Sequence, residues 1–255
     1  YGGALRDLVA SPTWELGEWT DDTAMMLLLA DSLADREGYD ESDLLARYVI
    51  WARSAPKDLP VAVGRALLRA RTPAEARLAA RVYLDEGAGN EPLARTVPIA
   101  IRYRRHEGEI RWISRAESSL THADPLVGDV CAFFNLTAAA LIRGKRPPKP
   151  RSELEHELAA AAAVSPAELT ELVQRQIGHV LTAARVAFAC GLGAQSFEEA
   201  VVSAANLGGD ADTNAAATGA LAGARFGLGA VPQRWLEYLH DRDAITVLAS
   251  RLVRA

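Results

Sequence analysis

The chain has 255 residues, with 28 Lys or Arg and 33 Asp or Glu, so its formal net charge is −5 (28 − 33). Hydrophobic residues make up 49% and charged residues 24%, the proportions of a globular protein long enough to bury a core. The mildly acidic balance excludes a broadly basic surface for nucleic acid or membranes, and no uninterrupted run of 18 apolar residues predicts a transmembrane helix.

The N-terminal half is typical of helices separated by short loops. Residues 1–18 hold Pro12 and three glycines, so we expect a surface loop there, followed by a buried helix over 23–33. Further helices are predicted over 60–70, from a capping box at 72–75, and over 92–105 with an interruption before Pro98. Between them, Ser42 is expected to cap an amphipathic helix whose apolar face is Leu44, Leu45, Tyr48, Val49 and Ala52.

The C-terminal half continues in the same way. Asp124-Pro125 starts a long apolar helix that Gly144 ends, and residues 145–150, with three prolines and three basic residues, form a linker-like segment. Capping boxes predict helices from 152, 165 and 196, and a further helix over 181–189 is stopped by Gly191. The last helices are expected over 232–240 and 244–253. Since no segment alternates like a strand, we predict an all-α fold, a compact single-domain bundle of about ten or more helices over residues 1–255.

Residues 208–214 (GGDADTN) contain residue types that are typical of a site for a divalent cation. On an extended segment Asp210 and Asp212 point to the same side, Thr213 adds a third hard oxygen, and the two glycines allow a tight turn. Mg²⁺, Mn²⁺ and Ca²⁺ favour such oxygen ligands. The alternative is that Asp212 or Thr213 only caps the helix that follows.

That following helix, residues 215–227, is rich in small residues. One of its faces repeats every four positions through Ala215, Gly219, Gly223 and Gly227. We therefore expect another helix to pack closely against a nearly bare backbone, which would make this helix central to the fold.

Residues 19–23 (WTDDT) hold a second set of hard oxygens at a predicted helix start, where the exposed N–H groups and the helix dipole favour ionised carboxylates. If Asp22 meets Asp210 and Asp212, the carboxylates repel one another unless cations neutralise them. We predict that the two motifs converge around one or two divalent cations. The alternative is two unrelated capped helices on the surface.

The two aspartate motifs, with the glycine-containing helix, resemble the two hallmark motifs of the ADP-ribosylglycohydrolase family. Shorter pieces match in the same order: Gly89-Asn90 with Arg95 and Pro98, residues 120–125 (LTHADP) and residues 232–236 (PQRWL). The resemblance covers nearly the whole chain. It implies an all-α fold with a dinuclear Mg²⁺ or Mn²⁺ centre.

The resemblance also implies an activity: metal-dependent removal of ADP-ribose from a modified acceptor, through an N- or O-glycosidic link on a protein side chain. The partner would be ADP-ribose or an ADP-ribosylated substrate, most commonly linked through arginine, with serine, guanidine and nucleic-acid links left open. We expect no membrane partner, see no direct sign of nucleic-acid binding, and expect a cytoplasmic monomer. The implied catalytic residues are Asp21 and Asp22; the metal ligands are Thr20, Asp21, Asp22, Asp210, Asp212 and Thr213; the ligand contacts are Gly89, Asn90, Ser119, His122, Gly208 and Gly209. An isolated histidine such as His122 is equally compatible with a structural role.

Two departures from the family pattern leave another function open. Members usually begin with a helix and then a glutamate that completes the metal site, and Glu15 and Glu18 lie too close to the first motif to be its counterparts. We therefore expect a single domain that lacks the family's N-terminal helix. The family's Gly-Asn-Gly is followed here by Glu91-Pro92, which removes backbone freedom and an N–H donor. The alternative is a non-catalytic ADP-ribose-binding module or pseudoenzyme of the same fold.

Overall fold

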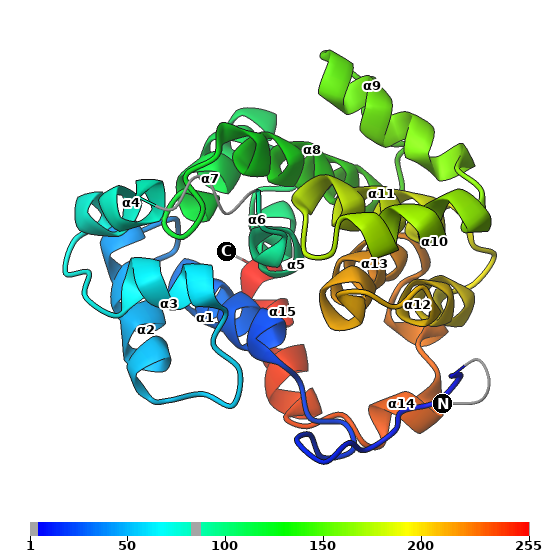
Figure 1. Cartoon of the computed structure of the whole chain (residues 1–255), viewed down its shortest axis with the longest axis horizontal. Coiled ribbons are helices and arrows are strands. Elements are labelled where there is room, and N and C mark those ends of the chain that lie inside the picture. The colour runs from blue at the N-terminus through cyan, green and yellow to red at the C-terminus, as the bar shows by residue number, and fades with distance from the viewer. Residues whose placement is uncertain (1–4, 83–87, 255) are drawn as a thin grey trace.

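The computed structural model describes residues 5–82 and 88–254, which form helices joined by loops (Figure 1). Over these residues there is no β-strand, only one isolated antiparallel bridge between Gly89 and His179. The predicted all-α fold is confirmed. In chain order the helices are α1 (Asp21–Asp35), α2 (Glu41–Arg53), α3 (Val61–Leu67), α4 (Pro73–Arg81), α5 (Glu91–Arg95), α6 (Val97–Arg102), α7 (Glu107–Ser118), α8 (Pro125–Ile142), α9 (Glu153–Ala160), α10 (Pro166–Arg175), α11 (Val180–Gly193), α12 (Phe197–Asn206), α13 (Ala211–Phe226), α14 (Gln233–Leu236) and α15 (Arg242–Arg254).

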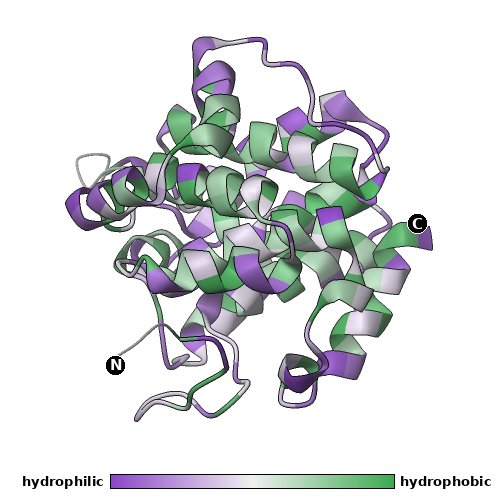
Figure 2. Cartoon of the chain, turned by 90° about the vertical axis from the view of Figure 1, so that its right-hand side faces the viewer, coloured by the Kyte–Doolittle hydropathy of each residue, from purple (hydrophilic) through white to green (hydrophobic). Residues whose placement is uncertain are grey.

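Helix α8 lies at the centre and packs against α7, α13, α6 and α5. Within the described chain it is the one helix long and apolar enough to meet the length and composition of a membrane span, but 72% of it is buried inside the protein. Its apolar surface is therefore covered by other helices of the same chain. Figure 2 shows the same division, with hydrophobic residues along the inner helices and hydrophilic ones gathered at outer loops and turns.

An early and a later group of helices pack on opposite sides of α5 and α6. In Figure 1, α1–α4 lie on one side and α10–α13 on the other, with the short helices α5 and α6 between them. Helix α5 contacts both α1 and α13. The chain thereby brings residues near 21 and residues near 210 to the same region.

Most predicted helix starts are confirmed by side-chain caps. The side chains of Thr72, Ser152, Ser165 and Ser196 each accept a hydrogen bond from a backbone N–H of the first turn, and Ser165 with Glu168 forms a complete capping box. The cap of α2 was predicted wrongly, because Asp40 rather than Ser42 accepts from the backbone there. Its predicted apolar face is buried as expected.

Helix α7 was not predicted. Its N-cap residue, His106, makes no side-chain cap, and Gly108 lies in its first turn, so a capping residue is absent although Glu107 and Glu109 are acidic residues of the first turn. The helix is strongly amphipathic and buries Ile110 and Ile113 against α8. Tertiary packing stabilises this segment in place of a local cap.

The prediction that Gly191 stops α11 was wrong, since the helix continues through it to Gly193. Gly191 is instead the point of close approach to α13: a Cβ there would lie 3.0 Å from Leu221 Cβ. The face of Gly219 and Gly223 is looser than predicted, because a Cβ at either position would make only ordinary contacts, 3.7 and 3.9 Å from side chains of α12. Helix α13 is central, but its tightly packed face is the one that carries Leu221.

Candidate functional site

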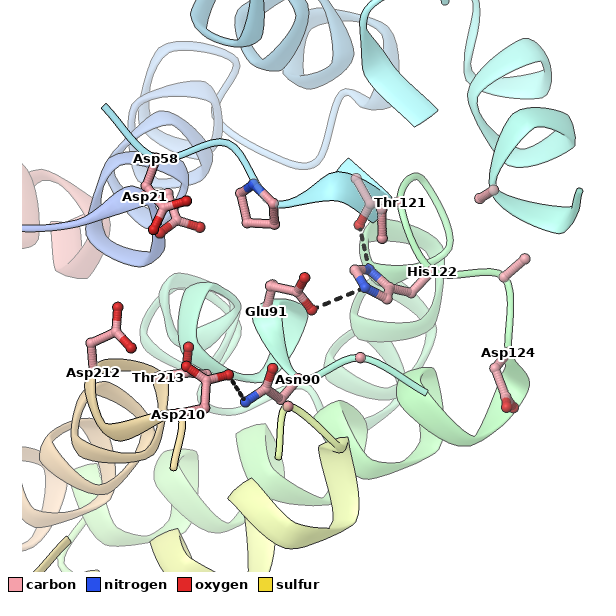
Figure 3. A pocket seen from close by; sticks show the side chains of 16 residues that line it. Asp21, Asp58, Asn90, Glu91, Thr121, His122, Asp124, Asp210, Asp212 and Thr213 are labelled. Atoms are coloured by element: carbon pink, nitrogen blue, oxygen red, sulfur yellow. Dashed lines mark hydrogen bonds and ion pairs between the residues drawn. The ribbon is translucent and has the colours of Figure 1, made fainter. Parts of the chain in front are cut away.

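A pocket of about 370 Å³ lies where the first turns of α1, α5 and α13 meet the loop between α7 and α8 (Figure 3). Its walls come from segments far apart in the sequence, which the packing of α5 against α1 and α13 brings together. The lining residues are Asp21, Asp58, Pro60, Ala62, Ala80, Gly89, Asn90, Glu91, Thr121, His122, Ala123, Asp124, Gly178, Asp210, Asp212 and Thr213.

The first aspartate motif forms the start of α1. Asp21 lines the pocket, whereas Asp22 is 3% exposed and neither of its carboxylate oxygens has a hydrogen-bond partner within the described chain. Thr20 is the N-cap residue of α1 without a side-chain cap bond, and it lines a smaller neighbouring pocket that shares Asp21 and Asp58 with the first. A buried carboxylate without partners is costly unless another group compensates it.

The second motif forms the start of α13. Asp210 is the N-cap residue, and Asp210, Asp212 and Thr213 all line the pocket. Gly208 and Gly209 make the tight turn that precedes the helix, with φ of +75° and +65°, and do not line the pocket. Two motifs 188 positions apart (210 − 22) therefore approach one another at two helix N-termini.

The carboxylates of this region resist ionisation because they are buried near one another. Burial, then the charges of Asp58 and Asp212, raise the pKa of Asp21 to about 7. Burial and the neighbouring Asp21 and Asp212 also raise the pKa of Asp22 well above its usual range. The pKa of Asp210 rises to about 6 through burial, against the hydrogen bond that Asn90 Nδ2 donates to its Oδ2 at 2.8 Å. Over the described residues no Lys or Arg lines the pocket to offset these charges.

The donor set fits a hard divalent cation. Carboxylate and hydroxyl oxygens from two helix starts surround one pocket, and the unpartnered carboxylate of Asp22 lies behind it. Across residues 5–82 and 88–254, however, no three His, Cys, Asp or Glu side chains are grouped closely enough to hold a metal ion as they stand. The chemistry of the residues suits a cation, and the dinuclear centre stays a prediction.

The predicted ligand contacts divide into two groups. Gly89, Asn90 and His122 line the pocket. Ser119 does not: it ends α7, where its hydroxyl accepts from Arg77 Nε at 2.8 Å and donates to the carbonyl of Ala116 at 2.8 Å. The hydroxyl of Ser119 therefore both accepts and donates a hydrogen bond within the protein, which is a structural role.

Four polar residues of the pocket were not among the predicted site residues: Asp58, Glu91, Thr121 and Asp124. Asp124 caps α8, so its sequence signal was structural, and Asp58 lies in a loop without any motif. Glu91 stood out only as a departure from the family pattern. In the structure it lies between the Asp21–Asp58 pair and Asp210, and its charge raises the pKa of both Asp21 and Asp210 (Figure 3).

Glu91 is paired with His122. Its Oε2 lies 3.0 Å from His122 Nε2, with side chains 18% and 4% exposed. Burial alone would raise the pKa of Glu91, but the contact with His122 outweighs it and the pKa is lowered. Glu91 is thus kept as an anion, whereas the pKa values of Asp21 and Asp210 are raised.

Comparison with known proteins identifies relatives along the whole chain. The model of the ADP-ribosylglycohydrolase family matches residues 1–255. An ADP-ribosylarginine hydrolase of Serratia proteamaculans is 30% identical over 97% of this chain and 71% of its own length. An ADP-ribosyl-[dinitrogen reductase] glycohydrolase of Rhodospirillum rubrum is 27% identical over 88% of this chain and 74% of its own. A solved structure titled ADP-ribosylglycohydrolase-related protein complex superposes with a TM-score of 0.77 and 33% identity, covering 99% of this chain and 87% of that one.

Proposed function

This chain belongs to the ADP-ribosylglycohydrolase family, and from that premise we propose that it is a hydrolase that removes ADP-ribose from a modified acceptor. The observation that carries the proposal is the pocket itself. It gathers Asp21 of one motif with Asp210, Asp212 and Thr213 of the other, in a cavity of about 370 Å³. Two motifs that resemble the family's hallmarks therefore share one cavity large enough for part of a nucleotide.

The cofactor in this proposal is a pair of Mg²⁺ or Mn²⁺ ions. The residues that would hold them are Thr20, Asp21, Asp22, Asp210, Asp212 and Thr213. The raised pKa values of Asp21 and Asp210 are what uncompensated carboxylates show, and the orphaned Asp22 is a further donor without a partner. When bound, such cations neutralise the carboxylates and orient the substrate diol and a water molecule.

Of the two aspartates named for catalysis, Asp21 has the better position, because it lines the cavity while Asp22 lies behind it. We assign to Asp21 the acceptance of the proton from the attacking water, and to Asp22 the support of the site's charge from behind. Gly89, Asn90 and His122 would contact the ADP-ribose, and Asn90 also holds Asp210 through its amide.

The acceptor is proposed to be a protein side chain joined through an N- or O-glycosidic bond. The relatives whose names specify an acceptor act on ADP-ribosylarginine and on dinitrogen reductase. A non-catalytic binding module is less well supported, because these relatives are named as hydrolases and both aspartate motifs are retained. We further propose that the protein acts as a monomer in the cytoplasm, in keeping with the two free thiols Cys131 and Cys190.

A panel of ADP-ribose conjugates linked through arginine, serine or guanidine, incubated with Mg²⁺ or Mn²⁺, tests the proposal. Release of free ADP-ribose from at least one conjugate is expected, and Asp21→Asn should abolish it. Asp129→Asn is the matched control, since Asp129 is a half-exposed aspartate outside the pocket whose ion pair in the described structure is with exposed Arg115. Binding of ADP-ribose without release from any conjugate would identify the chain as a binding module instead.

A further inference from the structure

A continuous line of polar contacts runs from the core into the pocket. It begins at a fully buried ion pair, in which Arg95 Nε donates to Glu117 Oε1 at 2.7 Å and both side chains are 0% exposed. Tyr48 donates its hydroxyl to the same carboxylate oxygen at 2.8 Å. Arg95 lies on α5, which also carries Glu91, and Glu117 lies on α7, which ends shortly before His122. The ion pair therefore fixes these two helices relative to each other.

From this ion pair the contacts continue to the pocket. Arg95 Nη2 donates to Thr121 Oγ1 at 2.7 Å, and Thr121 Oγ1 lies 2.9 Å from His122 Nδ1. Both Thr121 and His122 line the pocket and are nearly completely buried. Beyond the imidazole, Nε2 lies 3.0 Å from Glu91 Oε2.

The direction of these bonds decides where the proton of His122 resides. A guanidinium can only donate, so Thr121 Oγ1 must accept from Arg95, and its own proton needs an acceptor. His122 Nδ1 is the acceptor within reach in the described structure. With Nδ1 accepting, the ring proton must be on Nε2.

The other states of the ring are disfavoured by the same contacts. A proton on Nδ1 would leave the buried Thr121 hydroxyl without an acceptor, which is unfavourable for a buried polar group. In the neutral ring it would also turn the Nε2 lone pair towards the carboxylate of Glu91. The doubly protonated ring again leaves the Thr121 proton without a partner.

The far side of the ring faces Glu91, and the Nε2 atom itself is buried. The approach of Nε2 to Glu91 is short but bent, so Nε2 keeps no aligned hydrogen-bond partner within the described residues. Gly89 leaves the space for this pair, because a Cβ there would lie 2.4 Å from Nε2 and 2.6 Å from Glu91 Oε2. Of the two side chains, it is Glu91, 18% exposed, that presents an acceptor to the pocket.

We propose that Arg95 and Thr121 are positioning residues that fix His122 as the tautomer with its proton on Nε2, so that His122 holds the carboxylate of Glu91 in place to accept from a sugar hydroxyl. A hydroxyl can donate to the carboxylate. A phosphate oxygen only accepts, and the charge of Glu91 repels it. The identity of the hydroxyl as one of the ribose groups of ADP-ribose rests on the proposed function; the tautomer does not.

The tautomer is read directly from the imidazole ¹⁵N resonances of the ligand-free full chain. The wild-type protein is expected to show His122 protonated on Nε2. Thr121→Val removes the hydroxyl at nearly constant volume and should produce a mixture of tautomers, while Thr121→Ser should restore the wild-type pattern. The matched control is Thr218→Val, because the Thr218 hydroxyl is also buried but has no partner in the structure.

Binding is then measured by calorimetric titration of ADP-ribose in the presence of Mg²⁺. Glu91→Gln should raise the dissociation constant about tenfold, as loss of one hydrogen bond to a charged group does. Thr121→Val should raise it by a smaller factor, about twofold for an even mixture of tautomers. The double variant should lose little more than Glu91→Gln alone, because Thr121 acts on the hydroxyl only through His122 and Glu91. Thr218→Val should bind like the wild type.

The outcomes separate this inference from the proposed function. A wild-type His122 protonated on Nδ1, or a Thr121→Val ring unchanged in its tautomer, would overturn the inference whatever the protein binds. Unchanged ADP-ribose affinity in Glu91→Gln would overturn the assignment of the hydroxyl contact. Absence of any ADP-ribose binding by the wild-type protein would count against the proposed function and leave the tautomer to be judged by its resonances alone.

Discussion

Replacing Glu117 by alanine should be among the most damaging changes in the protein. The carboxylate is 0% exposed and accepts from both Arg95 and Tyr48, and Arg95 is 0% exposed as well. Without Glu117 the guanidinium stays in the core as an unpaired charge, which costs about 3–5 kcal/mol. A domain is stable by only about 5–15 kcal/mol, so much of the total is lost.

Urea unfolding followed by circular dichroism measures this loss, and the melting temperature should fall by roughly 10 °C for a chain of this size. Glu107→Ala on the same helix is the matched control. Glu107 pairs with Arg151 at 3.3 Å, with side chains 50% and 68% exposed, and exposed pairs contribute about 0–1 kcal/mol.

The Arg95–Glu117 pair also leads to a second prediction. The pair is not ideal, because Glu117 Oε2 has no hydrogen-bond partner in the described structure. Replacing both charges by methionine removes the unpaired charge along with the pair, so the double variant should be more stable than Glu117→Ala alone. If Glu117→Ala unfolds at the same urea concentration as Glu107→Ala, the buried charge is not what fixes α5 to α7.

Three further outcomes are expected. Millimolar Mg²⁺ or Mn²⁺ should raise the melting temperature, because a ligand bound only by the folded state stabilises that state. Asp210→Asn should remove most of that rise. A melting temperature of the wild-type protein that neither ion changes would argue against the cation site. Gly191→Ala should lower the free energy of unfolding by about 1–3 kcal/mol, because the added methyl group meets Leu221. Gly219→Ala should leave it unchanged or raise it by up to about 1 kcal/mol. Equal effects of the two variants in chemical unfolding would refute the packing assigned to α13. Hydrogen bonds and ion pairs with two arginines and a serine lower the pKa of Asp43 to about 2, against the effect of burial. The stability that Asp43 contributes is therefore present above about pH 4 and is lost as the pH falls towards 2. In Asp43→Asn the free energy of unfolding should depend less on pH over that window.

The helical class and most helix starts could be predicted from the sequence because they depend on local chemistry. Thr72, Ser152, Ser165 and Ser196 cap helices through their own neighbouring N–H groups, which needs no knowledge of the rest of the chain. Helix α7 was missed for the converse reason, since it has no local cap and is stabilised by packing on α8.

The aspartate motifs were also visible in the sequence, because each groups several hard oxygens at a helix start and the two resemble the family's hallmark motifs, although helix capping alone explains each motif equally well. Their meeting in one pocket was a hypothesis that depended on α5 packing against both α1 and α13. Sequence spacing misjudged the glycines, since a four-residue repeat does not say which neighbour approaches: Gly191 on α11 makes the tight contact, and Gly219 does not.

Glu91 shows most clearly what could not be predicted from the sequence. Its identity could be noted as unusual in the sequence, but its function could not be inferred there, because His122 lies 31 positions away (122 − 91) and nothing local connects them. The tertiary structure sets Oε2 3.0 Å from Nε2 and aligns Thr121 and Arg95 behind the ring. The sequence alone determined which groups were available and which helices present them. Which charges meet was decided only by the packing of α5 against α1 and α13 and by the Arg95–Glu117 pair that joins α5 to α7, because the direction and strength of polar contacts depend on ångström-scale distances between residues remote in the chain.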